Sequence, residues 1–281
     1  MGVSVNTRCL LCQLERNVAA ARKLGTEEQA TAFAKDLMKL LAEAPQGVSA
    51  PFFSPGVAQL LDKHYGLGPD RYKQEKLDSN AFVLARLPQI REKVFSAPDP
   101  VKAGLQFAIL GNYIDFAGLR GDVSFEKLDE MLEKAHEFEP DREVYKQLCS
   151  DLTNSKELLY LTDNAGEICF DRLFMEAIHE KYPELNITVC VRGGPTANDA
   201  TREDAAEAGI EFPVIDNGNR VPGTQIDLLS REALDAHTAQ YVKDFRNVRK
   251  KADVEQLLLE YQNCIVFKSV VNDAIAGIAY K

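Results

Sequence analysis

Two adjacent oxygen-bearing side chains, Asp163 and Asn164, follow closely after a short apolar run of the chain, residues 158–161. The residues directly after the run read TDNAGE, and an apolar pattern at helical spacing resumes at Ile168. Carboxylate and amide oxygens are the ligands that hard divalent cations such as Mg²⁺ and Mn²⁺ prefer. The position of this pair predicts a polar site where a buried strand ends and a helix begins.

Polar residues also follow the ends of three further strand-like runs. The carboxyl ends of the strands of a parallel sheet lie along one edge, and ligands bind there. We therefore expect the residues that follow the four runs to line one site. Those after the second, third and fourth runs are Arg192, Gly193, Gly194, Asn198 and Asp199; Asp216, Asn217 and Gly218; and Lys268, Ser269, Asn272 and Asp273.

The chemistry that suits such an edge is a divalent cation bound beside a phosphate group. Two carboxylates and an amide hold Mg²⁺ or Mn²⁺ and leave positions for water and a phosphate oxygen. Lys268 would neutralise the phosphate, and backbone amides of the helix that starts after Gly166 would donate hydrogen bonds to it. Glu167 is a candidate for orienting either a water molecule or one of the side chains that bind the metal. A histidine-rich zinc site is not expected, because none of the four histidines lies in these loops.

Each of these residues also has a structural alternative. Asp163 and Asp199 are each placed to cap the N-terminus of the helix that follows. Lys268 is placed to extend its apolar stem along the end of a strand toward solvent. Glu167 and Asp171 lie four residues apart on one helical face, which is typical of a solvent-exposed stripe. The sequence alone leaves these alternatives open.

Residues 1–150 are predicted to form a helical N-terminal portion. Thr26 and Gln29 form the signature of a capping box at the start of one amphipathic helix. Pro55 and Gly66 mark the beginning and the end of another. No strand is expected before Glu157. Further helical patterns lie at 80–94, 100–110 and 125–138.

Residues 151–281 are predicted to form the portion that binds metal and phosphate. Strand-like runs occupy 157–162, 186–193, 211–216 and 263–268. Amphipathic segments lie between or beside them at 167–182, 200–208, 226–239 and 253–262. Strands that alternate with helices in this way indicate a parallel sheet with both faces covered. The predicted fold class is therefore α/β, with a Rossmann-like, mostly parallel sheet and a helical N-terminal portion.

The bulk composition is that of a globular protein. The 281 residues are 45% hydrophobic and 27% charged, with a formal net charge of −10, which disfavours non-specific binding to nucleic acid. The N-terminal segment has no long apolar stretch, so neither a signal peptide nor a membrane anchor is expected. Cys169, Cys190 and Cys264 lie in apolar runs where a buried thiol fits. Reduced cysteines and a cytoplasmic location are expected.

Four motifs together resemble the metal-dependent damage-control phosphatases, a family also called domain of unknown function 89. LTDNAGE at 161–167 and VRGGPTANDAT at 191–201 resemble its two signature motifs. GNYIDFA at 111–117 resembles the Gly-Asn-x-x-Asp-Phe segment of its helical part. Cys9 and Cys12, followed by Gln13, resemble the start of its stand-alone microbial subfamily. The motifs occur in the order of the family and span most of the chain.

The resemblance implies a phosphoric monoester hydrolase that acts in metabolite damage control. Family members hydrolyse small phosphometabolites, including sugar phosphates, with Mn²⁺, Mg²⁺, Co²⁺ or Ni²⁺. The metal ligands carry over onto Asp163, Asn164 and Asp199, and the phosphate-contacting lysine carries over onto Lys268. Asn112 would face the same cleft. With the strand-end residues, the expected substrate contacts are Asn112, Arg192, Asn198, Lys268 and Asn272, and the expected catalytic residues are Asp163, Asn164, Glu167 and Lys268.

The segment after Lys268 departs from the family pattern. The family commonly continues with Gly-Gln-Gly-Asn-Phe-Glu, whereas this chain reads KSVVNDAIAG. Asn272 is kept, but Val270 and Val271 lack the backbone freedom of glycine, which bears on the substrate range. A catalytically inactive protein that binds a phosphometabolite is therefore one alternative function. A SAM-dependent carboxyl methyltransferase is another, although a nucleoside cofactor needs a glycine-rich turn and Gly166 is a single glycine.

The paired cysteines and the chemical step each leave an alternative open. No second CxxC accompanies Cys9 and Cys12, so a four-cysteine zinc site is not expected. We expect these thiols to be buried in the helical core, with a metal or redox role as the alternative.

Water positioned by the metal is expected to attack the phosphoryl group in line, and an aspartyl-phosphate on Asp163 is the alternative. The oligomeric state is left open.

Overall fold

The computed structural model describes residues 5–45, 48–68, 70–120, 125–222, 264–268 and 277–279 of the chain. For residues 112–120, 125–128, 264–268 and 277–279 it describes the backbone. The chain separates into two compact units. The smaller consists of Met1–Tyr72, Gly194–Ala197 and Arg220–Gly223, and the larger of Lys73–Gly193, Asn198–Asn219 and Thr224–Lys281.

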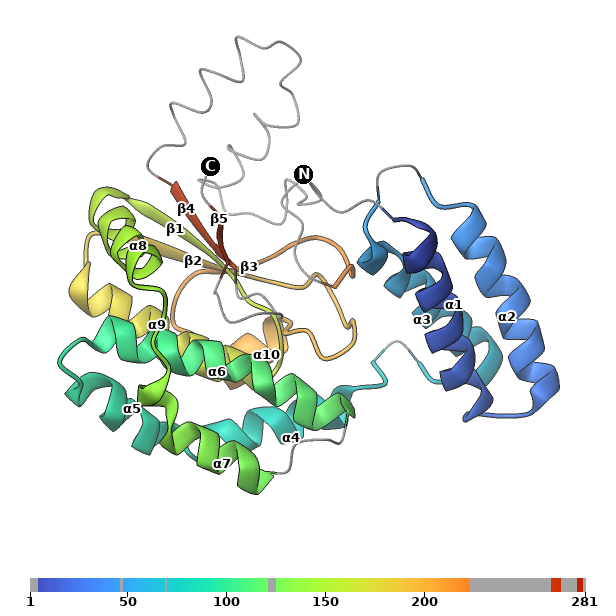
Figure 1. Ribbon diagram of the computed structural model, residues 1–281, viewed down its shortest axis with the longest axis horizontal. Helices are drawn as coiled ribbons and strands as arrows, with labels where there is room; N and C mark the ends of the chain where they lie inside the picture. The colour runs from blue at the N-terminus through green and yellow to red at the C-terminus, as the bar shows by residue number, and fades with distance from the viewer. Residues whose placement is uncertain are drawn as a thin grey trace, which may run out of the picture. The chain divides into compact units, whose positions relative to one another are not determined.

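The smaller unit is helical. The predicted capping box is present: the Gln29 backbone N–H donates to Thr26 Oγ1 at 3.2 Å, and the Thr26 N–H donates to Gln29 Oε1 at 3.0 Å. The third helix ends at Gly66, whose φ of 66° is the left-handed conformation that glycine adopts readily. Its elements are α1 (Thr7–Arg22), α2 (Glu27–Ala42), the 3₁₀ helix η1 (Ala50–Phe53) and α3 (Ser54–Tyr65) (Figure 1). Its buried core consists of Ala21, Phe33, Leu37, Phe53, Val57 and Leu61.

The larger unit contains the remaining helices. Two of them, α6 and α9, pack against each other closely through glycine (Figure 1). A methyl group added at Gly104 would lie 2.9 Å from the Cα of Phe174, and one added at Gly111 would lie 2.9 Å from the Cγ of Glu167. The absence of side chains therefore lets α6 approach the first turn of α9. The helices are α4 (Lys73–Leu84), α5 (Leu87–Ser96), α6 (Pro100–Arg120), α7 (Phe125–Glu133), η2 (Ala135–Glu137), α8 (Arg142–Asn154), α9 (Glu167–Lys181) and α10 (Arg202–Glu207).

The compact units divide at Tyr72 and Lys73, whereas the sequence suggests a boundary at residue 150. The sequence pattern changes at 150 because strands begin there, but the helices from α4 onward pack with the sheet. One continuous apolar core includes Val94 of α5, Phe107 of α6 and Val189 of the second strand. The units are therefore defined by contacts between residues that are far apart in the chain, and a local sequence pattern does not show such contacts.

Within the described residues, the sheet has five strands in the order β3-β2-β1-β4-β5. The first four are parallel, and β5 runs antiparallel to β4. Leu161 at the end of β1 is in register with Cys190 on one side and Lys268 on the other. The strand order reverses at β1, so the carboxyl end of β1 is where a ligand site is expected. The strands are β1 (Glu157–Leu161), β2 (Asn186–Val191), β3 (Val214–Asp216), β4 (Cys264–Lys268) and β5 (Gly277–Ala279) (Figure 1).

The predicted α/β fold with a mostly parallel sheet is confirmed. β3 begins at Val214, three residues after the start of the predicted run, because Pro213 has no N–H to extend the ladder. β5 was not predicted, since three residues are too few to display a strand pattern. The predicted helices at 226–239 and 253–262 lie outside the described residues. Among the described helices, none has both the length and the apolar character needed to cross a membrane.

Cysteine burial is only partly as predicted. Cys169 and Cys190 are buried and free, and burial raises the pKa of each thiol to about 12. The side chain of Cys264 lies outside the described residues. The expectation that both residues of the N-terminal pair are buried is wrong: Cys12 is exposed and Cys9 is partly exposed. Helix α1 buries little of its surface, and its one fully buried residue is Ala21.

Candidate active site

The turn after β1 carries the first two candidate ligands. The Thr162 N–H donates to the Cys190 carbonyl at 3.1 Å and extends the pairing of β1 with β2 by one residue. Asp163 and Asn164 come next, and Gly166, with φ 81° and ψ −53°, is the residue at the N-terminus of α9. A positive φ at this position favours glycine. The alternative in which Asp163 caps α9 is wrong, since Gly166 holds the capping position and no side chain makes a capping hydrogen bond to the first turn of α9.

The segment after β2 lies directly against this turn. Asp199 does not cap α10, because the capping position belongs to Thr201, whose N–H donates to Asp204 Oδ2 at 2.8 Å. Backbone pairing places the third candidate ligand beside the other two, although they are about 35 residues apart in the chain. Three pairings join the segments: the Ala165 N–H to the Asn198 carbonyl at 2.8 Å, the Ala200 N–H to the Asp163 carbonyl at 2.7 Å, and an antiparallel bridge between Asn164 and Asp199.

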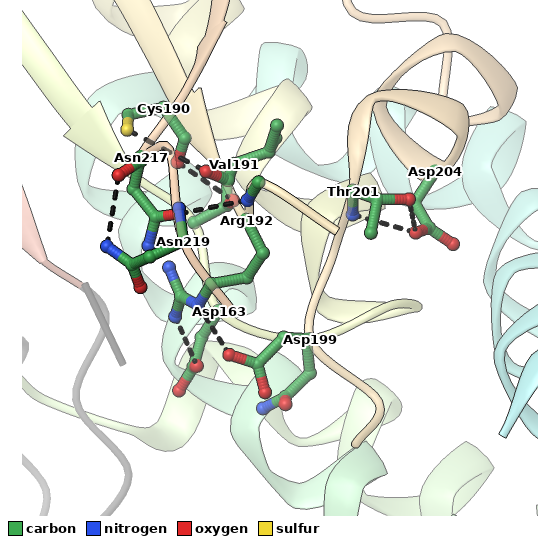
Figure 2. A network of polar contacts seen from close by, with 12 residues as sticks. Asp163, Cys190, Val191, Arg192, Asp199, Thr201, Asp204, Asn217 and Asn219 are labelled. Carbon is green, nitrogen blue, oxygen red and sulfur yellow. Dashed lines mark hydrogen bonds and ion pairs between the residues drawn. The ribbon is translucent and has the colours of Figure 1, made fainter. Parts of the chain in front are cut away.

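Arg192 lies between the two candidate carboxylates (Figure 2). Its Nε is 2.5 Å from Asp199 Oδ2, and one terminal nitrogen is 3.3 Å from Asp163 Oδ1. The Arg192 side chain is 1% exposed, that of Asp199 5% and that of Asp163 17%. A buried guanidinium that bridges two carboxylates neutralises much of their mutual repulsion. Arg192 is therefore part of the centre of the site.

Glu167 orients the amide of Asn164. The amide nitrogen of Asn164 donates to Glu167 Oε2 at 3.2 Å, and both residues are buried. A carboxylate can only accept, so its partner on the amide must be the nitrogen. The amide oxygen is thereby turned away from Glu167, as a metal ligand requires. Glu167 itself is held against Gly111 at the start of the GNYIDFA motif, where no side chain separates the two helices.

The exposed-stripe alternative for Glu167 and Asp171 is wrong, because both are fully buried. The Tyr160 hydroxyl donates to Asp171 Oδ1 at 2.6 Å, and the other carboxyl oxygen has no hydrogen-bond partner among the described residues. Burial, with a smaller contribution from the negative charge of Asp163, raises the pKa of Asp171 to about 8, although the Tyr160 hydrogen bond lowers it. Burial also raises the pKa of Tyr160 well above its ordinary value. Near neutral pH, Asp171 therefore holds a proton next to the site.

The oxygen donors fit a hard divalent cation. Asp163 and Asp199 offer carboxylate oxygens and Asn164 offers an amide oxygen, a set that Mg²⁺ and Mn²⁺ accept. The described ranges contain no cluster of three or more His, Cys, Asp or Glu residues that could hold a metal. The candidate ligand set has only two carboxylates, and its third member is an amide. Together with Arg192, these carboxylates leave one net negative charge. The carboxylate of Glu167 adds a second negative charge, and a divalent cation would offset both, which removes the repulsion of a phosphate.

The structure locates the predicted substrate-binding residues to different extents. Arg192 is at the centre of the site, and Asn198 is half-buried in the segment that pairs with the β1 turn. Lys268 ends β4 in register with Leu161, two residues before Asp163, and its side chain lies outside the described residues. Asn112 follows Gly111 in α6, and its side chain is likewise not described. Asn272 lies outside the described residues altogether.

Two structural roles near the site were not predicted. Asn217, after β3, is buried and accepts from the Gly193 N–H at 2.9 Å, which orders the loop that follows Arg192. Its position after a strand was noticed in the sequence, but its bond was not. Asn80, on α4, is fully buried and accepts from the Gly166 N–H at 2.6 Å. No sequence pattern marks it, because its partners lie more than 80 residues further along the chain.

The sequence matches the model of the damage-control phosphatase ARMT1-like domain over residues 5–242. The chain belongs to this family. An uncharacterised protein of Methanocaldococcus jannaschii is 30% identical over 239 residues, which are 83% of this chain and 77% of that protein. A DUF89 family protein of Pyrococcus horikoshii has a solved structure that superposes with a TM-score of 0.70 at 24% identity, covering 98% of this chain and 94% of that one, and it supports the fold.

Two relatives of the family carry the name damage-control phosphatase. The protein of Pyrococcus horikoshii is 36% identical over 136 residues, and the match covers 47% of this chain and 45% of that protein. The protein of Archaeoglobus fulgidus is 34% identical over 194 residues, and the match covers 66% of this chain and 65% of that protein. The resemblance noted in the motifs is therefore confirmed at the level of the family.

Proposed function

We propose that this protein is a divalent-metal-dependent phosphatase that hydrolyses small phosphorylated metabolites such as sugar phosphates. The observation that carries the proposal is the pairing of the turn after β1 with the segment after β2. That pairing puts Asp163, Asn164 and Asp199 side by side at the carboxyl edge of the sheet. Family membership and the names of the two relatives support the reaction class.

Each residue of the centre has a distinct task in this proposal. Asp163, Asn164 and Asp199 hold the cation, which can be Mn²⁺, Mg²⁺, Co²⁺ or Ni²⁺. When bound, the cation supplies positive charge that polarises the phosphoryl group and activates water. Glu167 fixes the orientation of the Asn164 amide, and its carboxylate is the nearby acceptor that orients water.

The phosphate is recognised by cationic and amide side chains around the centre. Arg192 already lies between the carboxylates, and its guanidinium would donate hydrogen bonds to a phosphate oxygen there. Lys268, at the end of the neighbouring strand, adds a second positive charge. Asn112, Asn198 and Asn272 are proposed to bind the rest of the substrate. Catalysis is then mainly positioning and charge neutralisation.

The methyltransferase alternative lacks support in the site. The turn after β1, residues 162–166, has a single glycine and presents carboxylate and amide side chains at the position where a nucleoside cofactor needs close backbone approach. An inactive binding protein differs from the proposed enzyme by the absence of turnover, so one assay separates them.

The test is a hydrolysis screen of the full chain over sugar phosphates and related phosphate esters with each of the four cations. Asp163→Asn and Asp199→Asn are expected to lower kcat by at least roughly 100-fold, because loss of a supporting residue alone costs about 10–100-fold. Asp216→Asn is the matched control: it is also an aspartate at the end of a strand, but it pairs with Arg202 at 2.8 Å. Activity that survives in both site variants, or in EDTA, would overturn the proposal.

A further inference from the structure

A buried polar cluster lies beside the candidate site in the larger unit. At its centre is Asn80 of α4, which is 0% exposed. Its amide oxygen accepts from the Gly166 N–H at 2.6 Å. Its amide nitrogen donates to Asp204 Oδ1 at 3.2 Å and to Glu207 Oε2 at 2.7 Å, both on α10. One side chain thus joins three separate elements of the fold.

Asp204 is the second member of this Asn80 cluster. Its Oδ2 accepts from Lys76 Nζ at 2.6 Å and from the Thr201 N–H and hydroxyl at 2.8 and 2.7 Å. Lys76 and Asp204 are both buried, and they lie on different helices. A buried charge pair with all these additional hydrogen bonds holds its members in one arrangement. α4 and the start of α10 are therefore joined rigidly.

The Asn80 cluster contacts the last residue of each of the two segments that carry the candidate metal ligands. Gly166 closes the turn that carries Asp163 and Asn164, and Thr201 follows Asp199 by two residues. The direct pairing of the turns sets their register, and the Asn80 cluster holds both from the side of α4. We propose that Asn80 is a positioning residue that sets the spacing of the metal ligands and thereby tunes metal affinity. This inference rests on the proposed function.

The chemistry of the position calls for asparagine. A backbone N–H requires an acceptor, and two carboxylates require donors, and an amide side chain supplies both in one planar group. Aspartate has the same shape and can still accept from Gly166, but it sets a carboxylate against Asp204 and Glu207. Asp204 and the new carboxylate are both buried and repel each other, whereas Glu207 is exposed, so the variant either separates α4 from α10 or takes up a proton. Separation changes the spacing directly, and a protonated carboxyl has one donor where the amide has two, so Asp204 or Glu207 loses the hydrogen bond that Asn80 gives it.

The test compares the full-length wild type with Asn80→Asp. Titration calorimetry with Mn²⁺ is expected to show an affinity about 10–100-fold lower in the variant, as for residues that orient metal ligands. Hydrogen exchange in the metal-free protein adds a readout that needs no metal: the Gly166 amide is expected to exchange slowly in the wild type and faster in the variant. Adding Glu207→Gln removes one of the facing carboxylates and is expected to restore part of the affinity.

Two control variants separate positioning from general destabilisation. Val83→Ala creates a cavity on the same helix, since Val83 is fully buried in the apolar core and makes no polar contact with the cluster. Asn186→Asp makes the same chemical change at an exposed amide that donates to Glu157 at 2.9 Å. Both are expected to keep the wild-type Mn²⁺ affinity.

Different failures of the test have different meanings. If Asn80→Asp binds Mn²⁺ as the wild type does, or if Val83→Ala weakens binding equally, Asn80 has no positioning role and the inference is overturned while the proposed function stands. If the wild type itself neither binds Mn²⁺ nor hydrolyses any phosphate ester, the proposed function is overturned and the effect on affinity falls with it.

Discussion

Replacing Arg192 with methionine removes the cation that lies between the two candidate metal ligands. In the metal-free protein the guanidinium is 2.5 Å from Asp199 and 3.3 Å from Asp163. Methionine fills a similar space but has neither charge nor donors. Arg192→Met therefore removes the positive charge that offsets the repulsion between the two carboxylates, and a bound cation can supply that charge again.

The size of the effect follows from the burial of the three side chains. Removing one member of a buried ion pair costs about 3–5 kcal/mol, because the remaining charge stays in a poorly solvated position. Arg192 and Asp199 are almost fully buried, whereas Asp163 is 17% exposed and recovers part of its hydration. We expect Arg192→Met to lower the free energy of unfolding in EDTA by about 3–5 kcal/mol. With Mn²⁺ the loss should be smaller, since the cation binds the folded variant more tightly than the wild type.

The assay is urea unfolding in EDTA and in excess Mn²⁺, followed by circular dichroism because the chain has no tryptophan. Arg172→Met is the matched control: Arg172 is 26% exposed, pairs with Glu176 at 2.7 Å and donates to the Ala208 carbonyl at 3.0 Å. A loss of about 1–2 kcal/mol, equal in EDTA and in Mn²⁺, is expected because neither partner is a candidate metal ligand. Arg192→Lys, which keeps the charge, should lose less than Arg192→Met. Unchanged stability of Arg192→Met in EDTA, or a deficit that Mn²⁺ enlarges, would refute the role given to Arg192.

Two further predictions concern buried residues next to the ligands. The pKa of Asp171 is raised from 3.8 to about 8. The contribution of this group to stability is therefore complete below pH 3.8 and is lost as the pH rises through about 8. Between these values the free energy of unfolding should fall with a slope that approaches about 1.4 kcal/mol per pH unit. Asp171→Asn should remove that slope, measured by urea unfolding from pH 5 to 9, and an identical slope in both proteins would contradict the burial argument. Gly111→Ala places a methyl group 2.9 Å from Glu167 Cγ, and it should cost about 1–3 kcal/mol and lower kcat. In Gly66→Ala no atom lies within 4 Å, and the left-handed backbone alone costs about 1–2 kcal/mol, so that control should lose stability and keep its kcat.

Much of the candidate site was visible in the sequence because its signals are local. Asp163, Asn164 and Asp199 each follow an apolar run, and parallel strands that share an edge must bring such positions near one another. The capping box at Thr26 and the helix end at Gly66 were also readable, since a cap depends on residues only a few positions apart. The fold class followed from the same alternation of strands and helices.

The surroundings of those candidate ligands could not be predicted in the same way. The pattern of Glu167 and Asp171 suggests a solvent-exposed stripe, yet both are buried: α6 approaches Glu167 at Gly111, and Tyr160 of β1 donates to Asp171. A stripe on one helix does not reveal what packs against it. The boundary at residue 150 differs from the compact units for the same reason, since helices far ahead in the chain complete the core of the sheet.

The sequence by itself determined which oxygen donors end the strands, where the helices begin and end, and to which family the chain belongs. These features depend on neighbouring residues, whose types fix the local backbone conformation. Only the tertiary structure decided that Arg192 lies between the two carboxylates and that Asn80 joins α4 to both ligand segments. Such contacts connect residues that are remote in the chain, and their energies come from burial that no local pattern encodes.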